Sequence, residues 1–209
     1  MLRRKPIADK LLPFIDGAAV FLLDEREVRS WPLDGFGGHG WPSFSVVVGA
    51  SFEGILEVAL ILHETLDALG MPNHAKTTGS RGIHVYVPIV RGPTQKQVWA
   101  FAKTLAGELA RRHPRLITAV YKKALRPTGH VLVDYNQNAW GRTLASVYSV
   151  RPTPRASVSA PLTWDEVARG MAIDDFRLDN VPARLARVGD LWSPLLAASP
   201  RVDLSKVSA

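Results

Sequence analysis

The chain has 209 residues, 46% of them hydrophobic and 22% charged, which is the composition of a soluble globular protein rather than a disordered one. No apolar run approaches the roughly 20 residues of a membrane-spanning helix, and no cysteine or secretory signal occurs, so we expect no membrane partner, no disulfide and a cytoplasmic location. The net charge of +7 favours an anionic partner, either nucleic acid or a phosphate-rich ligand, although charge alone is equally compatible with a basic protein that has neither.

The first half of the chain predicts one long helix between two strands. Residues 1–42 are irregular and rich in turn-forming residues. A β-branched run predicts a strand over 44–48, and apolar residues at helical spacing predict a helix over 52–69 that ends at Gly70. A second strand is expected over 83–90, directly after a turn that is flanked by glycines.

The second half predicts another long helix and several short strands. An apolar stripe runs along a predicted helix over 94–112. The capping-box pattern of Thr163 and Glu166 predicts a short helix, and the chain beyond Trp192 reads as loosely structured. The predicted strands of this half cover 117–121, 130–135 and 144–150. Elements in this order favour an α/β or α+β fold, a mixed sheet flanked by helices.

The densest group of polar residues lies at the turn before the second predicted strand. Gly79 and Gly82 flank Ser80 and Arg81, so backbone amides, a hydroxyl and a guanidinium there can bind phosphate oxygens. The Walker spacing is absent and a strand follows, which excludes a P-loop. The alternative is an ordinary β-turn with solvated side chains, with His84 as a core histidine.

A second candidate site surrounds Asp134, which ends a predicted apolar strand where the sheet meets a loop. A carboxylate in that place can hold a divalent metal ion. The alternative is that Asp134 only forms a turn, and one carboxylate is too few for a two-metal site. Trp140, in the following loop, is the tryptophan that best fits a base-stacking role, and the alternative for it, as for the other tryptophans, is core or surface packing. Basic residues that can contact a triphosphate or a DNA backbone flank Asp134 in the sequence: Lys122, Lys123, Arg126 and Arg142.

These segments resemble the polymerase domain of bacterial DNA ligase D, of the archaeo-eukaryotic primase superfamily. Order and spacing are kept over about two thirds of the chain. The matching stretches are Lys76-Thr-Thr-Gly-Ser-Arg-Gly-Ile-His-Val-Tyr-Val-Pro-Ile89, Arg126-Pro-Thr-Gly-His-Val-Leu-Val-Asp-Tyr-Asn-Gln-Asn138, Gly141-Arg-Thr143, Tyr148-Ser-Val-Arg151 and Val158-Ser-Ala-Pro-Leu-Thr-Trp-Asp-Glu-Val167. The resemblance implies a primase-polymerase fold that adds nucleotides, often ribonucleotides, at broken DNA ends in non-homologous end joining.

The resemblance also implies roles for single residues. Family members hold a divalent metal, commonly manganese, with an Asp-x-Asp pair on one strand and a third aspartate on another, and Asp134 matches that third catalytic and metal-binding residue. Ser80 and Arg81 match a Ser-Lys turn that holds the nucleoside triphosphate. The complete set of nucleotide-binding candidates is Lys76, Ser80, Arg81, His84, Arg126, Arg142 and His39. The implied partners are DNA ends, a nucleoside triphosphate, a DNA ligase and end-binding repair proteins, which would associate the protein with the nucleoid.

One part of the family pattern is missing. The Asp-x-Asp pair belongs on the strand before the first helix, where this sequence reads Ser43-Phe-Ser-Val-Val-Val-Gly-Ala-Ser-Phe52 and has no carboxylate. The N-terminal part is also shorter than is usual in the family, and the region that grips the 5′-phosphate of DNA is therefore reduced. Asp34 or Glu53 would have to replace the pair after a rearrangement, so loss of catalysis is the simpler interpretation.

We therefore expect a reduced N-terminal segment over 1–42, a primase-polymerase-like core over 43–195 and a tail over 196–209, and three hypotheses for function. The first is a protein that binds nucleotide and DNA ends in end joining, with weak or lost catalysis and no cofactor. The second is an active DNA-directed nucleotidyltransferase, with manganese or magnesium held by other ligands. The third is a non-catalytic interaction module with a vestigial pocket.

Overall fold

A six-stranded mixed sheet forms the centre of the computed structural model, which describes residues 43–47, 51–140, 142, 144–196 and 200–207. The strand order is β4-β5-β1-β3-β2-β6. Neighbouring strands are antiparallel except for the parallel pair β4 and β5. The strands are β1 (Ser43–Val47), β2 (His74–Thr77), β3 (Gly82–Tyr86), β4 (Ile117–Thr118), β5 (Val131–Asp134) and β6 (Pro161–Leu162). The expectation of a mixed sheet flanked by helices is confirmed.

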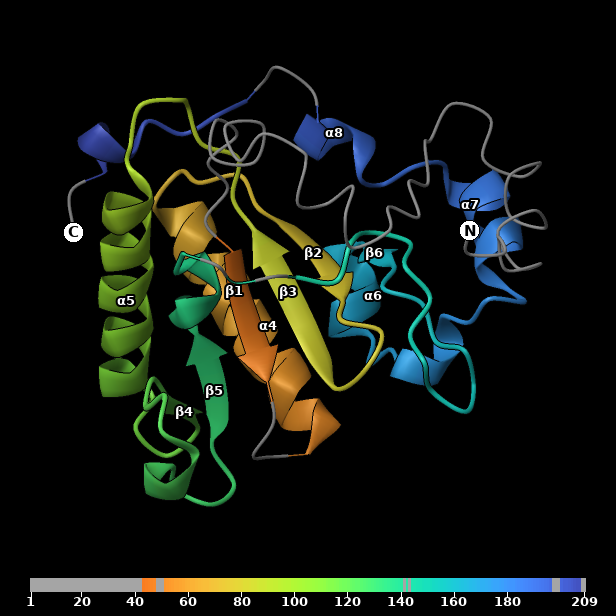
Figure 1. The fold of residues 1–209 in the computed structure, drawn as a ribbon, viewed down its shortest axis with the longest axis horizontal. Helices are drawn as coiled ribbons and strands as arrows, with labels where there is room; N and C mark the ends of the chain where they lie inside the picture. The colour runs from red at the N-terminus through yellow and green to blue at the C-terminus, as the bar shows by residue number, and fades with distance from the viewer. Residues whose placement is uncertain (1–42, 48–50, 141, 143, 197–199, 208–209) are drawn as a thin grey trace, which may run out of the picture.

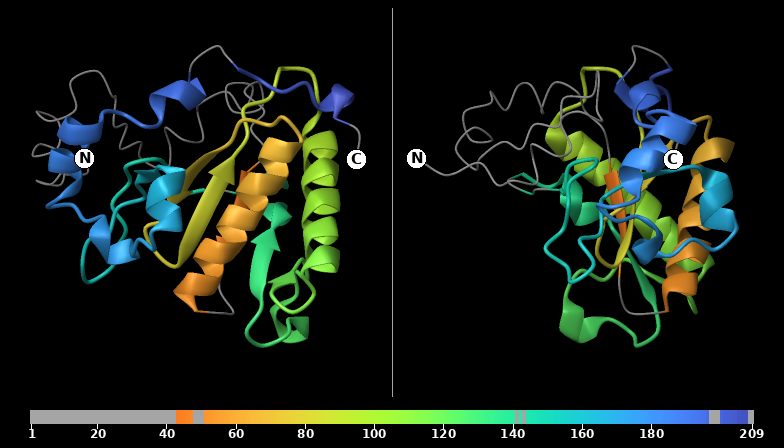
Figure 2. Two further views of the ribbon diagram at one scale, coloured as in Figure 1. Left: turned by 180° about the vertical axis from the view of Figure 1, so that it is seen from behind. Right: turned by 90° about the vertical axis from the view of Figure 1, so that its right-hand side faces the viewer.

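Two long helices, α4 (Phe52–Ala68) and α5 (Gln95–Arg112), cover the same face of this sheet (Figures 1 and 2). Each begins at a side-chain cap: Ser51 accepts a hydrogen bond from the amide of Gly54, and Thr94 forms a capping box with Gln97. The shorter helices are α6 (Trp164–Ala168), α7 (Val181–Val188) and α8 (Ser193–Leu196), and the 3-10 turns are η2 (Lys123–Leu125), η3 (Tyr135–Asn138), η4 (Ile173–Asp175) and η5 (Leu204–Lys206). None of the helices in the described ranges is long and apolar enough to cross a membrane.

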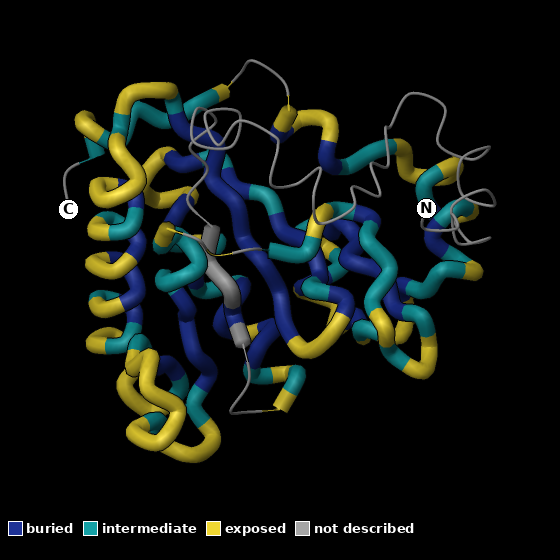
Figure 3. Tube along the Cα trace, in the orientation of Figure 1, coloured by how far each residue is buried: buried dark blue, intermediate teal, exposed yellow. Residues whose placement is uncertain are grey.

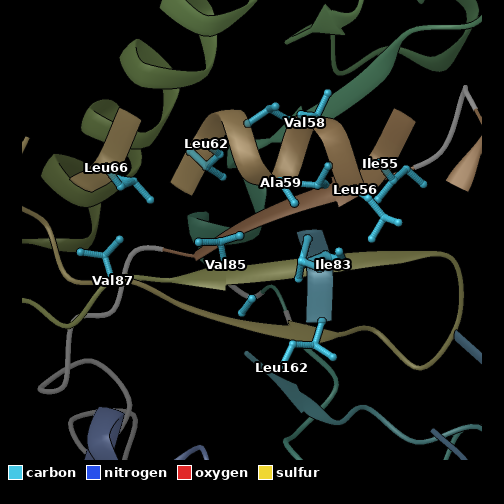
Figure 4. Packing of buried hydrophobic residues seen from close by; sticks show 14 of the residues in the cluster. Ile55, Leu56, Val58, Ala59, Leu62, Leu66, Ile83, Val85, Val87 and Leu162 are labelled. Atoms are coloured by element: carbon cyan, nitrogen blue, oxygen red, sulfur yellow. The ribbon is translucent and has the colours of Figure 1, made fainter. Parts of the chain in front are cut away.

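The two faces of the sheet differ in chemistry because strand side chains alternate. Ile83 and Val85 of β3 point toward α4 and join the main hydrophobic core, as Figure 4 shows. His84 and Tyr86 therefore lie on the opposite face. There Tyr86 packs edge-on against Trp192, and the two ring centroids are 5.0 Å apart. One face thus holds the main hydrophobic core, while the other carries polar residues beside a small apolar cluster.

Most of the elements predicted from periodicity are present. The long helices were predicted within one residue of their observed ends, and the capping box of Thr163 and Glu166 does begin α6. The strand predicted over 144–150 is wrong: only Val150 pairs, in an isolated bridge, because Ser146 begins a turn and Tyr148 adopts a positive φ of 60°. The predicted elements did not include β2, β6 or α7.

The segment near the C-terminus is better ordered than its composition suggests. Val202 pairs with Ile89 in a parallel bridge, and Leu204 and Val207 pack against the main core. The expectation of a loosely structured chain beyond Trp192 is therefore wrong for these residues. The predicted N-terminal segment over 1–42 lies outside the described residues.

Candidate nucleotide and nucleic-acid site

A row of four residues crosses the polar face of the sheet. Lys76 of β2 is the Cα partner of His84 of β3, His84 is the partner of Ser45 of β1, and Ser45 is the partner of Asp134 of β5. Residues directly opposite each other on antiparallel strands occupy the same face, with Cβ atoms about 4.5–5.5 Å apart. Residues from the two candidate segments of the sequence are thus brought into one line.

Lys76 is a buried cation at one end of this row. Only 1% of the residue is exposed, and its ammonium group donates hydrogen bonds to the carbonyl of Ala145 at 2.8 Å and to the hydroxyl of Ser159 at 2.6 Å. Both acceptors are neutral, and among the described residues no carboxylate lies within ion-pair distance of Lys76. Burial, reinforced by the nearby charge of Arg151, lowers the pKa of Lys76 to about 7.

Two nitrogen atoms beside Lys76 lack hydrogen-bond partners. They are Nδ1 of His84 and Nε of Arg151, and both are buried. Burial, followed by the charges of Lys76 and Arg151, lowers the pKa of His84 to about 2, so its ring is neutral at physiological pH. Buried polar groups are nearly always satisfied, and an unsatisfied one calls for an explanation. Three basic groups with two unpaired nitrogens have the chemistry of an anion site.

Arg151 reaches this cluster because the chain around it packs tightly on the β2–β3 hairpin. The hydroxyl of Ser157 donates to the carbonyl of Gly79 at 2.6 Å, and the hydroxyl of Ser159 donates to the carbonyl of Thr77 at 2.8 Å. A Cβ atom on Gly79 would lie 2.5 Å from Cγ of Arg151. Although Arg151 lies in a stretch used for the family resemblance, it was not among the predicted site residues. Its long-range contacts with the hairpin give no local sequence signal.

The tip of the hairpin has the amide geometry expected of an anion-binding turn. The backbone amides of Ser80, Arg81 and Gly82 all point at Oγ1 of Thr78, each at 3.1 Å. Converging amides of this kind form the concavities that bind phosphate and other anions. A hydroxyl oxygen of the chain accepts all three bonds here, while the side chains of Ser80 and Arg81 are exposed.

An open cleft of about 690 Å³ lies beside Ser80. Phe52 and Leu56 from the start of α4 and Met171 form its apolar lining. The loop over 153–157 and residues 170–174 complete the walls. The exposed hairpin tip therefore borders a space that is large enough for a small ligand.

Asp134 lies at the other end of the row, but the residues around it do not fit a two-metal site. One carboxylate oxygen of Asp134 accepts the amide of Asn136 at 2.8 Å, and the other accepts the side chain of Gln137 at 3.2 Å. The adjacent strand β1 reads Ser-Phe-Ser-Val-Val and has no carboxylate. The described residues contain no group of three histidines or carboxylates that could hold a metal ion. Asp134 instead caps the turn η3.

The remaining predicted residues are not joined to the cluster of Lys76 and His84 by any contact that we observe. Arg126 donates to the backbone carbonyls of Val120 and Tyr121, in the connection between β4 and β5. Arg142 donates to the hydroxyl of Tyr121. His39 lies outside the described residues.

Comparison with known proteins identifies the family. A model of the LigD primase-polymerase domain matches residues 48–192. The multifunctional non-homologous end joining protein LigD of Mycolicibacterium smegmatis is 34% identical over 155 residues, which are 74% of this chain and 20% of the relative. LigD of Pseudomonas aeruginosa is 30% identical over 151 residues, 71% of this chain and 18% of the relative. The chain thus spans about a fifth of the length of these curated relatives.

A solved structure supports the same assignment. The polymerase domain of Mycobacterium tuberculosis ligase D, in complex with DNA, is 31% identical with a TM-score of 0.70, over 77% of this chain and 56% of that chain. The fold and the resemblance drawn from the sequence are both confirmed. The chain belongs to the LigD primase-polymerase domain family.

Proposed function

We propose that this chain binds a nucleoside triphosphate and DNA ends in non-homologous end joining, and that its polymerase chemistry is weak or lost. One observation carries the proposal: the row across the sheet keeps its basic end and lacks the carboxylates that would complete its acidic end. Anion binding needs only the basic end. Metal-assisted nucleotidyl transfer needs both.

The basic end suits a chain of phosphates. Lys76 and His84 are buried and Arg151 is half-buried beside them, without a counter-charge among the described residues, and one nitrogen each of His84 and Arg151 is unpaired. A phosphate in that place would accept hydrogen bonds from both nitrogens and offset the repulsion between Lys76 and Arg151. Arg81, exposed at the hairpin tip, is available to a second phosphate of the same ligand.

The acidic end does not suit metal chemistry. In the family a divalent metal would offset the charge that develops on the transferred phosphoryl group. Asp134 alone faces a strand with serine at positions 43 and 45, and its own oxygens already accept two hydrogen bonds. We therefore infer that no metal-dependent step is retained on these residues. Asp34, which the sequence offered as a substitute, lies outside the described residues.

The relatives support the biological setting. They are named for non-homologous end joining, and the solved polymerase domain was captured with DNA. The proposed role has a DNA ligase and end-binding repair proteins as its partners, because the relatives are named for end joining. The excess of basic residues agrees with a DNA ligand.

Two measurements on one preparation test the proposal. Titration calorimetry with ATP should give binding that is weakened at least tenfold in His84→Ala and is unchanged in Lys96→Ala, an exposed residue of α5 that serves as the control. Primer extension should then be attempted on gapped DNA with a 5′-phosphate, manganese and labelled ribonucleotides, beside Asp134→Ala.

The outcomes separate the three hypotheses. ATP binding without extension supports the proposal. Extension that disappears in Asp134→Ala would show an active nucleotidyltransferase with metal ligands elsewhere in the chain. Absence of ATP binding from the folded protein would contradict the proposal and leave an interaction module with a vestigial pocket.

A further inference from the structure

Two aromatic side chains are exposed on the part of the chain that the structure describes, one in the connection between β4 and β5 and one in the loop after η3. Tyr121, in that connection, is 43% exposed, and Trp140, in the loop after η3, is 74% exposed. Figure 3 shows the connection itself as one of the most exposed parts of the molecule. With three quarters of Trp140 exposed, packing in the core does not account for its position, and its ring face is accessible to a ligand.

Arg142 joins the two segments. Its guanidinium lies 5.9 Å from the centre of the Tyr121 ring and donates a hydrogen bond of 3.1 Å to the Tyr121 hydroxyl. Arg142 follows Trp140 by two residues, so this contact ties the loop of Trp140 to the connection. Arg126 fixes the same connection from within by donating to the carbonyls of Val120 and Tyr121 at 2.9 and 2.5 Å. The Tyr121 ring and its backbone are thus both held in place before any ligand arrives.

The electrostatic surroundings point to an anionic ligand. Asp134 is the only carboxylate in the sequence between Glu108 and Asp165. Lys122 and Lys123 follow Tyr121 directly, are exposed, and form no ion pair with any of the described residues. Exposed rings surrounded by lysine and arginine are the combination that binds single-stranded nucleic acid, because bases stack on the rings while phosphates contact the cations.

We propose that Tyr121, Trp140 and Arg142 form a stacking surface for the unpaired bases of a single DNA strand, with Lys122 and Lys123 on its phosphates. This inference rests on the proposed binding of DNA ends and adds where the unpaired strand lies. The loop of Trp140 begins directly after η3, the turn that Asp134 caps. A strand on this surface therefore leads toward the row of polar residues on the sheet.

Fluorescence anisotropy with a labelled dT12 oligonucleotide tests the stacking surface without any nucleotide present. Trp140→Ala should weaken binding about five- to a hundredfold, the range found when a base-stacking ring is removed, whereas Trp140→Phe should retain most of the affinity. Leu196→Ala, which removes an exposed apolar side chain from α8, is the matched control and should bind as the wild type does. An abasic strand of twelve nucleotides, which has phosphates but no bases, should bind the wild type about as weakly as dT12 binds Trp140→Ala.

Salt dependence separates stacking from charge. Trp140→Ala should leave the slope of log affinity against log salt unchanged, while Lys122→Ala with Lys123→Ala should reduce the slope by about 0.7 for each phosphate that a lysine no longer neutralises. Equal affinity of Trp140→Ala and wild type for dT12 would overturn the proposal. Failure of the wild type to bind dT12 would also overturn it, whether or not the RNA oligonucleotide U12 binds. The ATP titration described above is independent of this surface, so a failure here is distinguishable from a failure of the nucleotide site.

Discussion

Lys76 and His84 are Cα partners on adjacent strands, so two buried basic side chains lie next to each other on one face of the sheet. Neither has an ion-pair partner among the described residues, and the positive charge of Arg151 lies close to both. An arrangement of this kind lowers the stability of the empty protein and increases its affinity for an anion. The two effects have opposite dependence on pH.

Stability should increase as the pH increases from 7 to 9. The pKa of Lys76 is about 7 in the folded protein and near 10.5 when the chain is unfolded, so the unfolded state binds more protons throughout this window. The free energy of unfolding in urea should therefore increase with pH in the wild type. In Lys76→Met, the part of this increase that comes from the titration of Lys76 should be absent. An identical pH slope in the two proteins would contradict the assignment of a depressed pKa to Lys76.

Affinity for ATP should decrease over the same range. Bound phosphates favour the charged form of Lys76, so binding takes up a proton and weakens as the pH rises above about 7. Titration calorimetry in buffers of different ionisation enthalpy measures that proton directly. Lys76→Met should bind more weakly at pH 7 and show little change up to pH 9. Proton uptake that persists in this variant would place the titrating group elsewhere.

Arg81→Ala should weaken ATP binding without altering stability. The Arg81 side chain is exposed at the hairpin tip, and its removal leaves the amide bonds to Thr78 in place. We expect an affinity loss of about five- to tenfold, the effect of one charge-assisted contact at an exposed site, with a weaker dependence on salt. Thermal unfolding without ligand serves as the control. An unchanged affinity would remove Arg81 from the site.

Gly79→Ala should destabilise the protein more than Gly129→Ala, although both glycines have a positive φ. At Gly79 the new methyl group would lie 2.5 Å from Cγ of Arg151 and 2.9 Å from backbone atoms of Val158 and Ser159, whereas nothing lies within 4 Å at Gly129. Backbone strain alone costs about 1–2 kcal/mol, and we expect about 3 kcal/mol or more at Gly79. Urea unfolding measures both. Equal losses of unfolding free energy in the two variants would show that the hairpin can move away from the segment around Arg151 with little loss of stability.

Aspartates at positions 43 and 45 should create a manganese site that the wild type lacks. Position 45 is the Cα partner of Asp134, and alternate residues of a strand share a face, so the double variant places three carboxylates together. Electron paramagnetic resonance of added Mn²⁺ should detect the bound ion. Asparagine at both positions is the isosteric control, and Asp134→Ala in the double variant should abolish binding. If the double variant binds no more Mn²⁺ than the wild type, restoring carboxylates on β1 beside Asp134 is not sufficient to form a metal site.

The sequence predicted the parts of this fold that depend on local periodicity. Helices α4 and α5 were found because their buried residues recur at helical spacing. Strand β2 was missed because four residues that include His74 and Lys76 show no apolar pattern, and β6 was missed because it has only two residues. The pairing of Lys76 with His84 could have been inferred, since both are four residues from Ser80 in the hairpin turn.

Long-range packing accounts for the features that the sequence did not predict. Arg151 reaches the hairpin because Ser157 and Ser159 bond to hairpin carbonyls that are 78 and 82 residues away in the sequence, and no local pattern predicts such contacts. Arg126 was expected near the nucleotide because of its position in the sequence, but it bonds to backbone carbonyls of its own connection. Its guanidinium is therefore occupied within the chain, and the predicted contact with nucleotide stays a prediction.

The shared hydroxyl of Thr78 gives the hairpin tip a property that hydrogen exchange can follow. One oxygen accepting three amides at 3.1 Å forms three weak bonds rather than one strong one. The amide hydrogens of Ser80, Arg81 and Gly82 should therefore exchange rapidly with deuterated water in the free protein. A phosphate that displaces the hydroxyl would bond to the same three amides more strongly and slow their exchange together. Mass spectrometry of the peptide that contains these three amides would then measure how much of the hairpin tip is occupied by phosphate.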